Sequence, residues 1–150
     1  MVMFGSDLIL GTKEVLVERS RMFLPVKMTG CEAGDKLYMF YSPNHDCIII
    51  HPEKKVYEMG KKYMDSDMEA REKELSKFGD YFLNFIGSTV VDKQKRIGLG
   101  VDVCCELDIK DSAFVVGCFD ELRVYPSKDL YIESIKKQKK DKLKKKGEFK

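Results

Sequence analysis

The sequence lacks the short motifs that mark several large enzyme classes. Its 150 residues contain no G-x-S-x-G nucleophile motif, no phosphate-binding P-loop and no H-E-x-x-H zinc motif. Its carboxylates recur at the spacing of helix surfaces and do not converge as a catalytic pair would. The sequence therefore predicts a protein that is not an enzyme and that uses neither a cofactor nor a small-molecule substrate.

Paired cysteines and long apolar runs are also missing. The five cysteines, an odd number, include no C-x-x-C pair, and the first ten residues contain Asp7 and no basic segment of a signal peptide. Such cysteine usage is typical of a reducing compartment, so we expect a cytoplasmic protein. No apolar run approaches the roughly 18 residues that a membrane-spanning helix needs, and we expect no membrane partner.

Candidate metal ligands are few. His45, Cys47 and His51 lie close together, but they fall across a predicted strand whose residues alternate between two faces, and a fourth ligand is not evident. We favour a packed strand with polar ends and expect no metal site. The neighbouring Cys104 and Cys105 make a poor disulfide, and we expect both to be buried as small apolar fillers.

Charge is unevenly distributed along the chain. Residues 136–150 hold nine lysines against Asp141 and Glu148 and contribute +7, so residues 1–135 carry −5 of the formal net charge of +2. An acidic body argues against a uniformly basic nucleic-acid surface, and any such surface must be local, in loops or in the tail. The tail has too few apolar residues to pack and is predicted to fray. Nonspecific nucleic-acid affinity and a solubilising role both remain open for it.

Apolar and β-branched segments between turn residues predict a mainly β protein. With 43% hydrophobic residues, the chain can bury the core of one ordinary domain or of two small half-domains. The predicted strands are 7–10, 14–17, 22–24, 37–41, 47–50, 81–86, 113–118 and 122–125. We expect the aromatic side chains of these strands and their turns to pack in the core or in a subunit interface. They are Tyr38, Phe40, Tyr41, Phe82, Phe85, Phe114 and Phe119.

Two prolines precede helical patterns, as a first helical turn tolerates proline. After Pro52 the apolar residues recur at helical spacing to about Lys77, with an interruption at 65–67, and a last helix follows Pro126. A shorter helical turn is predicted to reach Met28. The segment 101–107 is ambiguous.

A short charged loop, Asp92–Arg96, separates two apolar segments. It holds three cations, Lys93, Lys95 and Arg96, and a single carboxylate. A loop held between two strands can present such charges at fixed positions to an anionic partner. A solvated hairpin turn is the simpler interpretation of this loop taken alone.

The order of elements occurs twice in the chain. The pattern P-x-K-x-[VL]-Y begins at Pro52 and again at Pro126, 74 residues later, and Arg21 and Arg96 are 75 residues apart. A duplicated unit that is too small to bury its own sheet should close against its copy into one pseudo-twofold barrel. The predicted divisions are a first repeat (1–60), a helical connector (61–80), a second repeat (81–135) and the lysine-rich tail (136–150).

Under this symmetry two charged loops become equivalent, 17–21 in the first repeat and 92–96 in the second. The loops would then form one basic patch on an acidic body, of the kind that makes sequence-independent phosphate contacts. Its cations are Arg19, Arg21, Lys93, Lys95 and Arg96.

These residues resemble the MraZ family, whose members carry two SpoVT/AbrB-type swapped-hairpin repeats in one chain. The family signature is close to D-x-K-G-R-[LI]-x-[LI]-P, to which DKQKRIGLG at 92–100 and VERSRMFLP at 17–25 are similar. The resemblance covers about residues 3–135. It implies an α+β fold, a pseudo-twofold swapped-hairpin (AbrB-like) β-barrel from two tandem repeats with flanking helices.

The resemblance also implies a function. It indicates a transcriptional regulator that forms a ring-shaped homo-oligomer, acts on a division and cell-wall gene cluster and is associated with the nucleoid. Its partner would be double-stranded DNA. The residues that would contact DNA are Arg19, Arg21, Asp92, Lys93, Lys95 and Arg96.

Four residues depart from the family signature. Val17 stands in place of the aspartate, Ser20 and Lys95 replace the loop glycine, and Gly100 replaces the second proline. A glycine there indicates a positive φ, which Ser20 and Lys95 would adopt with strain, and Val17 cannot anchor its loop by accepting hydrogen bonds. The alternative hypothesis is an oligomeric protein-interaction module that has kept the fold and lost DNA binding.

Overall fold

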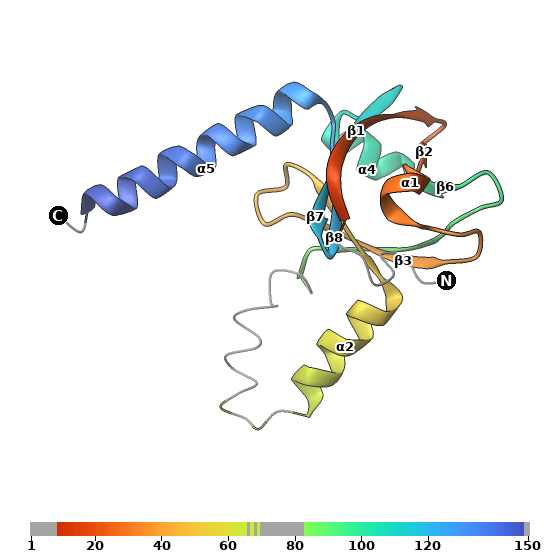
Figure 1. Cartoon of the computed structure of the whole chain (residues 1–150), viewed down its shortest axis with the longest axis horizontal. Coiled ribbons are helices and arrows are strands. Elements are labelled where there is room, and N and C mark those ends of the chain that lie inside the picture. Colours follow the sequence, from red (N-terminus) through yellow and green to blue (C-terminus); the bar gives the residue numbers. More distant parts are fainter. Residues whose placement is uncertain (1–8, 66, 68, 70–82, 149–150) are drawn as a thin grey trace.

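Eight antiparallel strands curve into a nearly closed barrel in the computed structural model, which describes residues 9–65, 67, 69 and 83–148 (Figure 1). The strands are β1 (Ile9–Glu18), β2 (Arg21–Phe23), β3 (Lys36–Tyr41), β4 (Ile48–Pro52), β5 (Phe85–Val90), β6 (Arg96–Gly98), β7 (Ser112–Phe119) and β8 (Glu121–Tyr125). The helices of the described residues are α1 (Val26–Thr29), α2 (Glu53–Met64), α4 (Val101–Leu107) and α5 (Lys128–Glu148). The predicted α+β class is confirmed.

The two halves of the chain alternate in the sheet as pairs of neighbouring strands. Their order is β5-β3-β4-β8-β7-β1-β2-β6, so β1 pairs with β7, β3 with β5, and β2 with β6. The ends of this sheet approach each other where the backbone N–H of Gly98 donates a hydrogen bond to Thr89 Oγ1 (3.2 Å). Neither half of the chain therefore holds a complete sheet of its own.

Two central strands, β4 and the 113–116 part of β7, are buried on both faces, which explains their continuous apolar sequences. Inward-facing residues such as Ile48 and Val115 belong to the main core inside the barrel. Outward-facing residues such as Ile49 and Phe114 form a smaller cluster, against which Tyr131 of α5 packs. The Phe114 and Tyr131 rings lie 5.4 Å apart, so the start of α5 covers the outer face of β7 and β8.

The predicted strands are largely confirmed, with changes at their ends. Residues 9 and 10 of the first predicted strand belong with 14–17 to one strand, β1, because Gly11 keeps its place in the pairing with β7 despite its φ of 115°. The strand predicted at 81–86 begins at Phe85, after a turn at Asn84, and runs to Val90. Residues 81 and 82, the far part of the connector and residues 1–8 lie outside the described residues.

The segment 101–107, which the sequence leaves ambiguous, is helix α4, and its orientation determines which of the two neighbouring cysteines is buried. Cys104 is buried and Cys105 is exposed, so the prediction that both are buried is wrong. Successive residues on a helix point about 100° apart, and α4 places a single face against the core. Gly100 precedes this helix with a φ of 92°, a conformation that the proline of the family signature cannot adopt.

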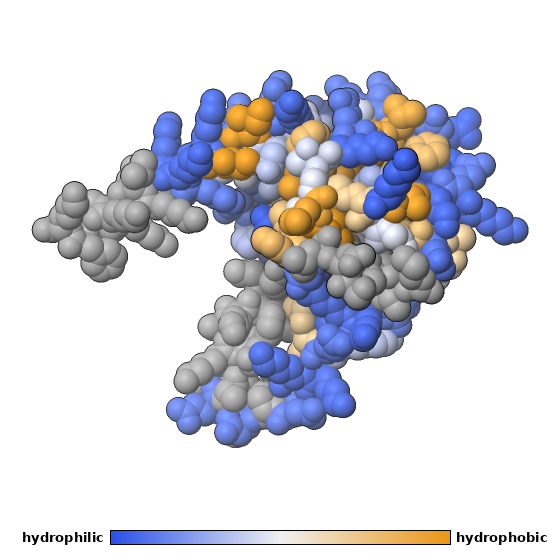
Figure 2. Space-filling view, in the orientation of Figure 1, coloured by the Kyte–Doolittle hydropathy of each residue, from blue (hydrophilic) through white to orange (hydrophobic). Residues whose placement is uncertain are grey.

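Helix α5 begins where Ser127 Oγ accepts a hydrogen bond from the backbone N–H of Leu130 (3.2 Å), a common N-terminal cap. The sequence predicts that the lysine-rich tail frays, but the helix continues to Glu148. Lysine is a good helix former even without packing, which accounts for this difference. It extends away from the barrel (Figure 1), and hydrophilic side chains dominate α2 and the edges of the barrel (Figure 2). Within the described ranges, no helix is long and apolar enough to cross a membrane.

Candidate nucleic-acid interface

The turn between β1 and β2 places two residues in left-handed conformations. Glu18 pairs with Arg21, so the turn consists of Arg19 (φ 50°) and Ser20 (φ 63°). Positive φ at both central residues is typical of a type I′ hairpin turn, whose twist matches that of the strands. Ser20 thus keeps the positive φ that the glycine of the family signature indicates, and the side chain of Arg19 is exposed at the tip.

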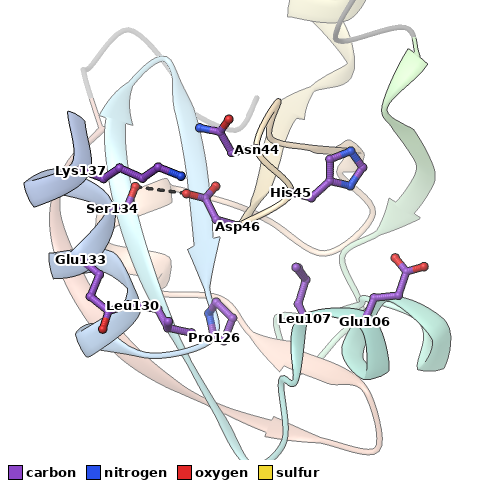
Figure 3. Close-up of a pocket in the computed structure, with 10 residues that line it drawn as sticks. All are labelled: Asn44, His45, Asp46, Glu106, Leu107, Pro126, Leu130, Glu133, Ser134 and Lys137. Atoms are coloured by element: carbon purple, nitrogen blue, oxygen red, sulfur yellow. Dashed lines mark hydrogen bonds between the residues drawn. The ribbon is translucent and has the colours of Figure 1, made fainter. Parts of the chain in front are cut away.

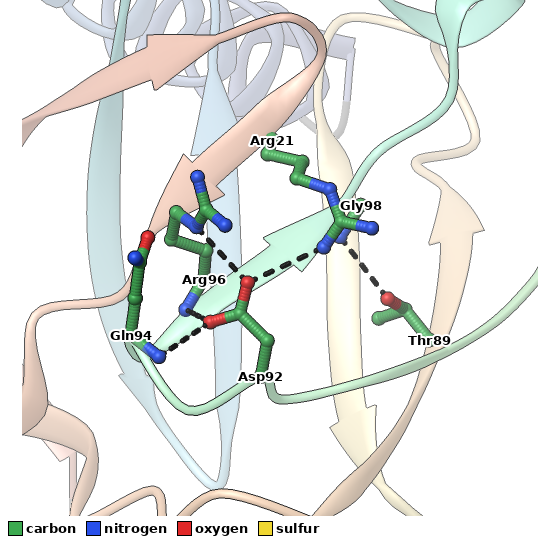
Figure 4. Close-up of polar contacts among 6 residues, drawn as sticks. All are labelled: Arg21, Thr89, Asp92, Gln94, Arg96 and Gly98. Atoms are coloured by element: carbon green, nitrogen blue, oxygen red, sulfur yellow. Dashed lines mark hydrogen bonds and ion pairs between the residues drawn. The ribbon is translucent and has the colours of Figure 1, made fainter.

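The loop between β5 and β6 is organised by the carboxylate of Asp92 (Figure 4). Its Oδ1 accepts hydrogen bonds from the backbone N–H groups of Gln94 and Arg96, and its Oδ2 accepts one from Arg96 Nε, each at 2.9 Å. These donors, the backbone N–H of Arg96 above all, hold the pKa of Asp92 below its usual value. In this loop Lys95 also keeps a positive φ, 62°, although it replaces the glycine of the family signature.

The two loops meet at Asp92. Arg21 Nη1 lies 3.3 Å from Asp92 Oδ2, and Figure 4 shows the guanidinium groups of Arg21 and Arg96 approaching this carboxylate from two sides. Behind them, β2 and β6 pair Met22 with Ile97. The side chains of Arg21 and Asp92 are 50% and 23% exposed, so their ion pair contributes orientation more than stability.

An open hollow of about 610 Å³ lies beside these loops. Its lining residues are the cations Arg19, Arg21, Arg96 and Lys110, the carboxylates Glu18 and Asp111, and Val17. Charged groups dominate this lining, with four cations against two carboxylates, and Asp92 beside it pairs with two of the cations, Arg21 and Arg96. The charged lining and the remaining N–H donors favour an anion over an apolar ligand.

The predicted site residues fall into two groups. Arg19, Arg21 and Arg96 line the hollow, and Asp92 bonds to two of them. Lys93 is exposed and Lys95 is partly buried, and neither lines the hollow. The structure thus brings three of the five predicted cations to one place.

Lys110 and Asp111 were missed by the sequence analysis. They belong to the connection between α4 and β7, which is held beside the first loop by a hydrogen bond from the Val17 N–H to the Asp111 carbonyl (2.9 Å). Only the long-range pairing of β1 with β7 brings the two segments together. No local pattern in the sequence marks them.

A second hollow, of about 320 Å³, lies between the β3–β4 turn, the end of α4 and the start of α5 (Figure 3). Here Ser134 Oγ donates a hydrogen bond to Asp46 Oδ2 (3.2 Å). The carboxylates of Asp46, Glu106 and Glu133 outnumber the single lysine of its lining, Lys137. This charge balance disfavours a phosphate, so the basic loops are the better candidate for nucleic acid.

The residues considered as metal ligands do not form a cluster. In the part of the chain that the structure describes, no group of three or more His, Cys, Asp and Glu side chains could hold a metal ion. His45 is exposed, whereas Cys47 and His51 are buried. Burial raises the pKa of Cys47 to about 11 and lowers the pKa of His51 to about 3, as expected for side chains packed within a sheet.

Comparison of the chain with models of known protein families and with curated proteins finds no match.

Proposed function

We propose that this protein is a DNA-binding transcriptional regulator that contacts the phosphate backbone through the β1–β2 turn and the β5–β6 loop. The observation that carries this proposal is the meeting of Arg19, Arg21 and Arg96, from segments far apart in the sequence, around one open hollow. Guanidinium groups bind phosphates through paired N–H donors, and a fixed orientation reduces the entropy lost on binding. Asp92 supplies that orientation for two of the three arginines.

We propose further that the barrel consists of two swapped-hairpin units of the kind that the MraZ family carries. The strand order supports this proposal. If the two end strands, β5 and β6, are taken as neighbours, the order becomes a closed ring, and replacing each of β1–β4 by its counterpart in β5–β8, and the reverse, gives the same ring. The hairpin turns support it too. Asp46 bonds to Ser134 of α5, and Asp120 lies 2.8 Å from Lys55 of α2, so each turn contacts the helix of the other half.

The proposed regulator acts as a ring-shaped homo-oligomer in the cytoplasm, associated with the nucleoid, and without enzymatic activity. One chain offers few phosphate contacts on an acidic body, so useful affinity requires several copies that bind together. Its proposed target is a division and cell-wall gene cluster, as the likeness to the MraZ family suggests.

The test removes two of the three arginines together, as Arg21→Ala with Arg96→Ala. We expect loss of binding to the DNA upstream of the gene that encodes the protein, measured by gel shift at several salt concentrations. The matched control removes two exposed cations elsewhere, as Lys54→Ala with Lys128→Ala, and should keep binding. Light scattering should give the same oligomer size for both variants. Unchanged binding of the arginine variant would reject the site.

A protein-interaction module is the second candidate, and one observation favours it. Leu10 and Leu16 on β1 are 61% and 63% exposed, and Phe119, whose neighbour across the sheet is Ile9, is 61% exposed. Large apolar side chains exposed along β1 and at the end of β7 are available for protein contacts. An intact oligomer that shifts no duplex would support this candidate, whereas a salt-sensitive gel shift would count against it.

A further inference from the structure

Lys110 sits on a backbone segment that is anchored at both ends. The preceding Ile109 is buried, and its N–H donates to the carbonyl of Cys104 (2.9 Å). The backbone carbonyl of the following residue, Asp111, accepts a hydrogen bond from the N–H of Val17, also at 2.9 Å. The base of the Lys110 side chain is therefore fixed relative to both α4 and β1.

The ammonium group of Lys110, by contrast, is only weakly held. Its Nζ lies 3.6 Å from Asp108 Oδ1, and the two side chains are 78% and 80% exposed. An exposed pair at this distance contributes little to stability. The side chain is thus free to turn from Asp108 toward an anion in the hollow that it lines.

The arginines of the hollow also keep donors for a second anion. Each guanidinium carries five N–H donors, and Asp92 engages Arg96 through Nε and Arg21 through Nη1. The guanidinium of Arg96 lies 5.7 Å from the centre of the Phe23 ring, which further limits its orientation. Two oriented guanidinium groups and one adjustable ammonium group suit the several oxygens of a phosphate.

This arrangement occurs beside the first loop only. The corresponding contact beside the second loop joins the N–H of Val91 to the carbonyl of Asp35 (2.9 Å). Asp35 and Asp111 therefore occupy equivalent positions. Asp111 is preceded by Lys110, whereas Asp35 is preceded by Gly34. The two halves therefore differ by one cation at equivalent positions.

We infer that the hollow is a site for one phosphate group per chain, completed by Lys110. This inference rests on the proposed function in one respect, that the phosphate belongs to the backbone of bound DNA. A free phosphate ion presents the same oxygens, so the experiment separates the two sources.

The first arm titrates the full chain with inorganic phosphate at constant ionic strength and follows the backbone amides by NMR. We expect saturable shifts at Arg19, Lys110 and Asp111. Lys110→Gln should weaken this binding several-fold, Lys110→Arg should retain it, and Lys54→Gln on α2 should leave it unchanged. Absence of local shifts, or equal effects of the two glutamine variants, would overturn the site.

The second arm measures binding to DNA duplexes of unrelated sequence. Lys110→Gln should weaken all of them about equally and reduce the slope of log K against log salt concentration by about 1. Phosphate binding that depends on Lys110, without any duplex binding by the wild type, would keep the site and reject the proposed function. Duplex binding that is insensitive to Lys110→Gln, with no phosphate shifts, would keep the function and reject the site.

Discussion

Arg21 and Asp92 form an ion pair at 3.3 Å although they lie 71 positions apart and belong to different halves of the chain. Asp92 also binds Arg96 and two backbone N–H groups of its own loop. One carboxylate therefore sets the position of both arginines. The matching backbone contacts of Val17 and Val91 place Glu18, and not Val17 as the signature alignment predicts, where the second loop has Asp92. Arg21 of the first loop nevertheless binds Asp92 of the second loop.

This relationship predicts an unusual effect of removing a negative charge. Asp92→Ala should weaken the proposed DNA binding several-fold, even though it makes the surface more basic, because Arg21 and Arg96 lose their orientation. Fluorescence anisotropy with a labelled duplex measures the effect, and Glu58→Ala on α2 controls for the change in net charge. Tighter binding by Asp92→Ala would show that charge outweighs orientation.

His51 predicts a loss of stability in acid. Burial, assisted by the nearby charge of Lys55, lowers its pKa from 6.5 to about 3. His51 therefore binds a proton below about pH 6.5 in the unfolded chain, but only below about pH 3 in the folded chain. The free energy of unfolding should fall across this window by up to about 1.4 kcal/mol per pH unit from this residue.

Urea denaturation at several pH values between 7 and 4 tests this expectation. The free energy of unfolding of His51→Gln should fall less steeply with decreasing pH than that of the wild type, because about one proton fewer is taken up on unfolding. His45→Gln, which changes the exposed histidine, should keep the wild-type slope. Equal slopes for the wild type and both variants would contradict the assignment to His51.

Two glycines should respond to alanine in opposite directions. A Cβ at Gly117 on β7 would lie 2.6 Å from Ile9 Cγ2 and 3.0 Å from the Ile9 backbone, and Ile9 is buried. Gly117→Ala should therefore destabilise the protein by about 1–3 kcal/mol. Gly60 on α2 has no atom within 4 Å of such a Cβ, and Gly60→Ala should stabilise by up to about 1 kcal/mol. Chemical denaturation measures both, and a neutral Gly117→Ala would mean that β1 and β7 adjust without cost.

The two left-handed loop residues should tolerate glycine. Ser20 and Lys95 have φ values of 63° and 62°, a conformation that costs residues with a Cβ about 1 kcal/mol or more. Ser20→Gly and Lys95→Gly should each raise stability by up to about 1 kcal/mol, as read from the midpoint of thermal unfolding. Ser88→Gly, in the extended strand β5, should lower it. Destabilisation by all three changes would indicate that the side chains of Ser20 and Lys95 make compensating contacts.

Local chemistry and the repeat account for what the sequence predicted. The turn residues and apolar alternation located the strands, whereas the replacement of the signature glycine by Ser20 and Lys95 indicated strain and did not settle the loop geometry, which keeps a positive φ at both residues. The equivalent spacing of Arg21 and Arg96 predicted neighbouring loops, and the pairing of β2 with β6 places them side by side. Each of these predictions depends on short segments or on one internal comparison.

Features that depend on long-range packing could not be predicted in this way. Cys105 is exposed because α4 turns only one face to the core, and the short segment 101–107 gave no clear period. The strand β1 continues through Gly11 because β7 pairs with β1 from Ile9 to Leu16. Lys110 joins the hollow because β1 and β7 bring two remote connections together, which a single sequence does not reveal.

The interleaving of the strands also bears on how the chain folds. Each half leaves strand edges that pair with strands of the other half, so we expect the two halves to behave like the subunits of a dimer joined in one chain. The covalent link then acts mainly by raising the effective concentration of one half around the other. Two separately expressed halves should accordingly assemble into the same barrel in a concentration-dependent reaction, and the intact chain should fold slowly for its size, because most of its sheet forms between remote segments.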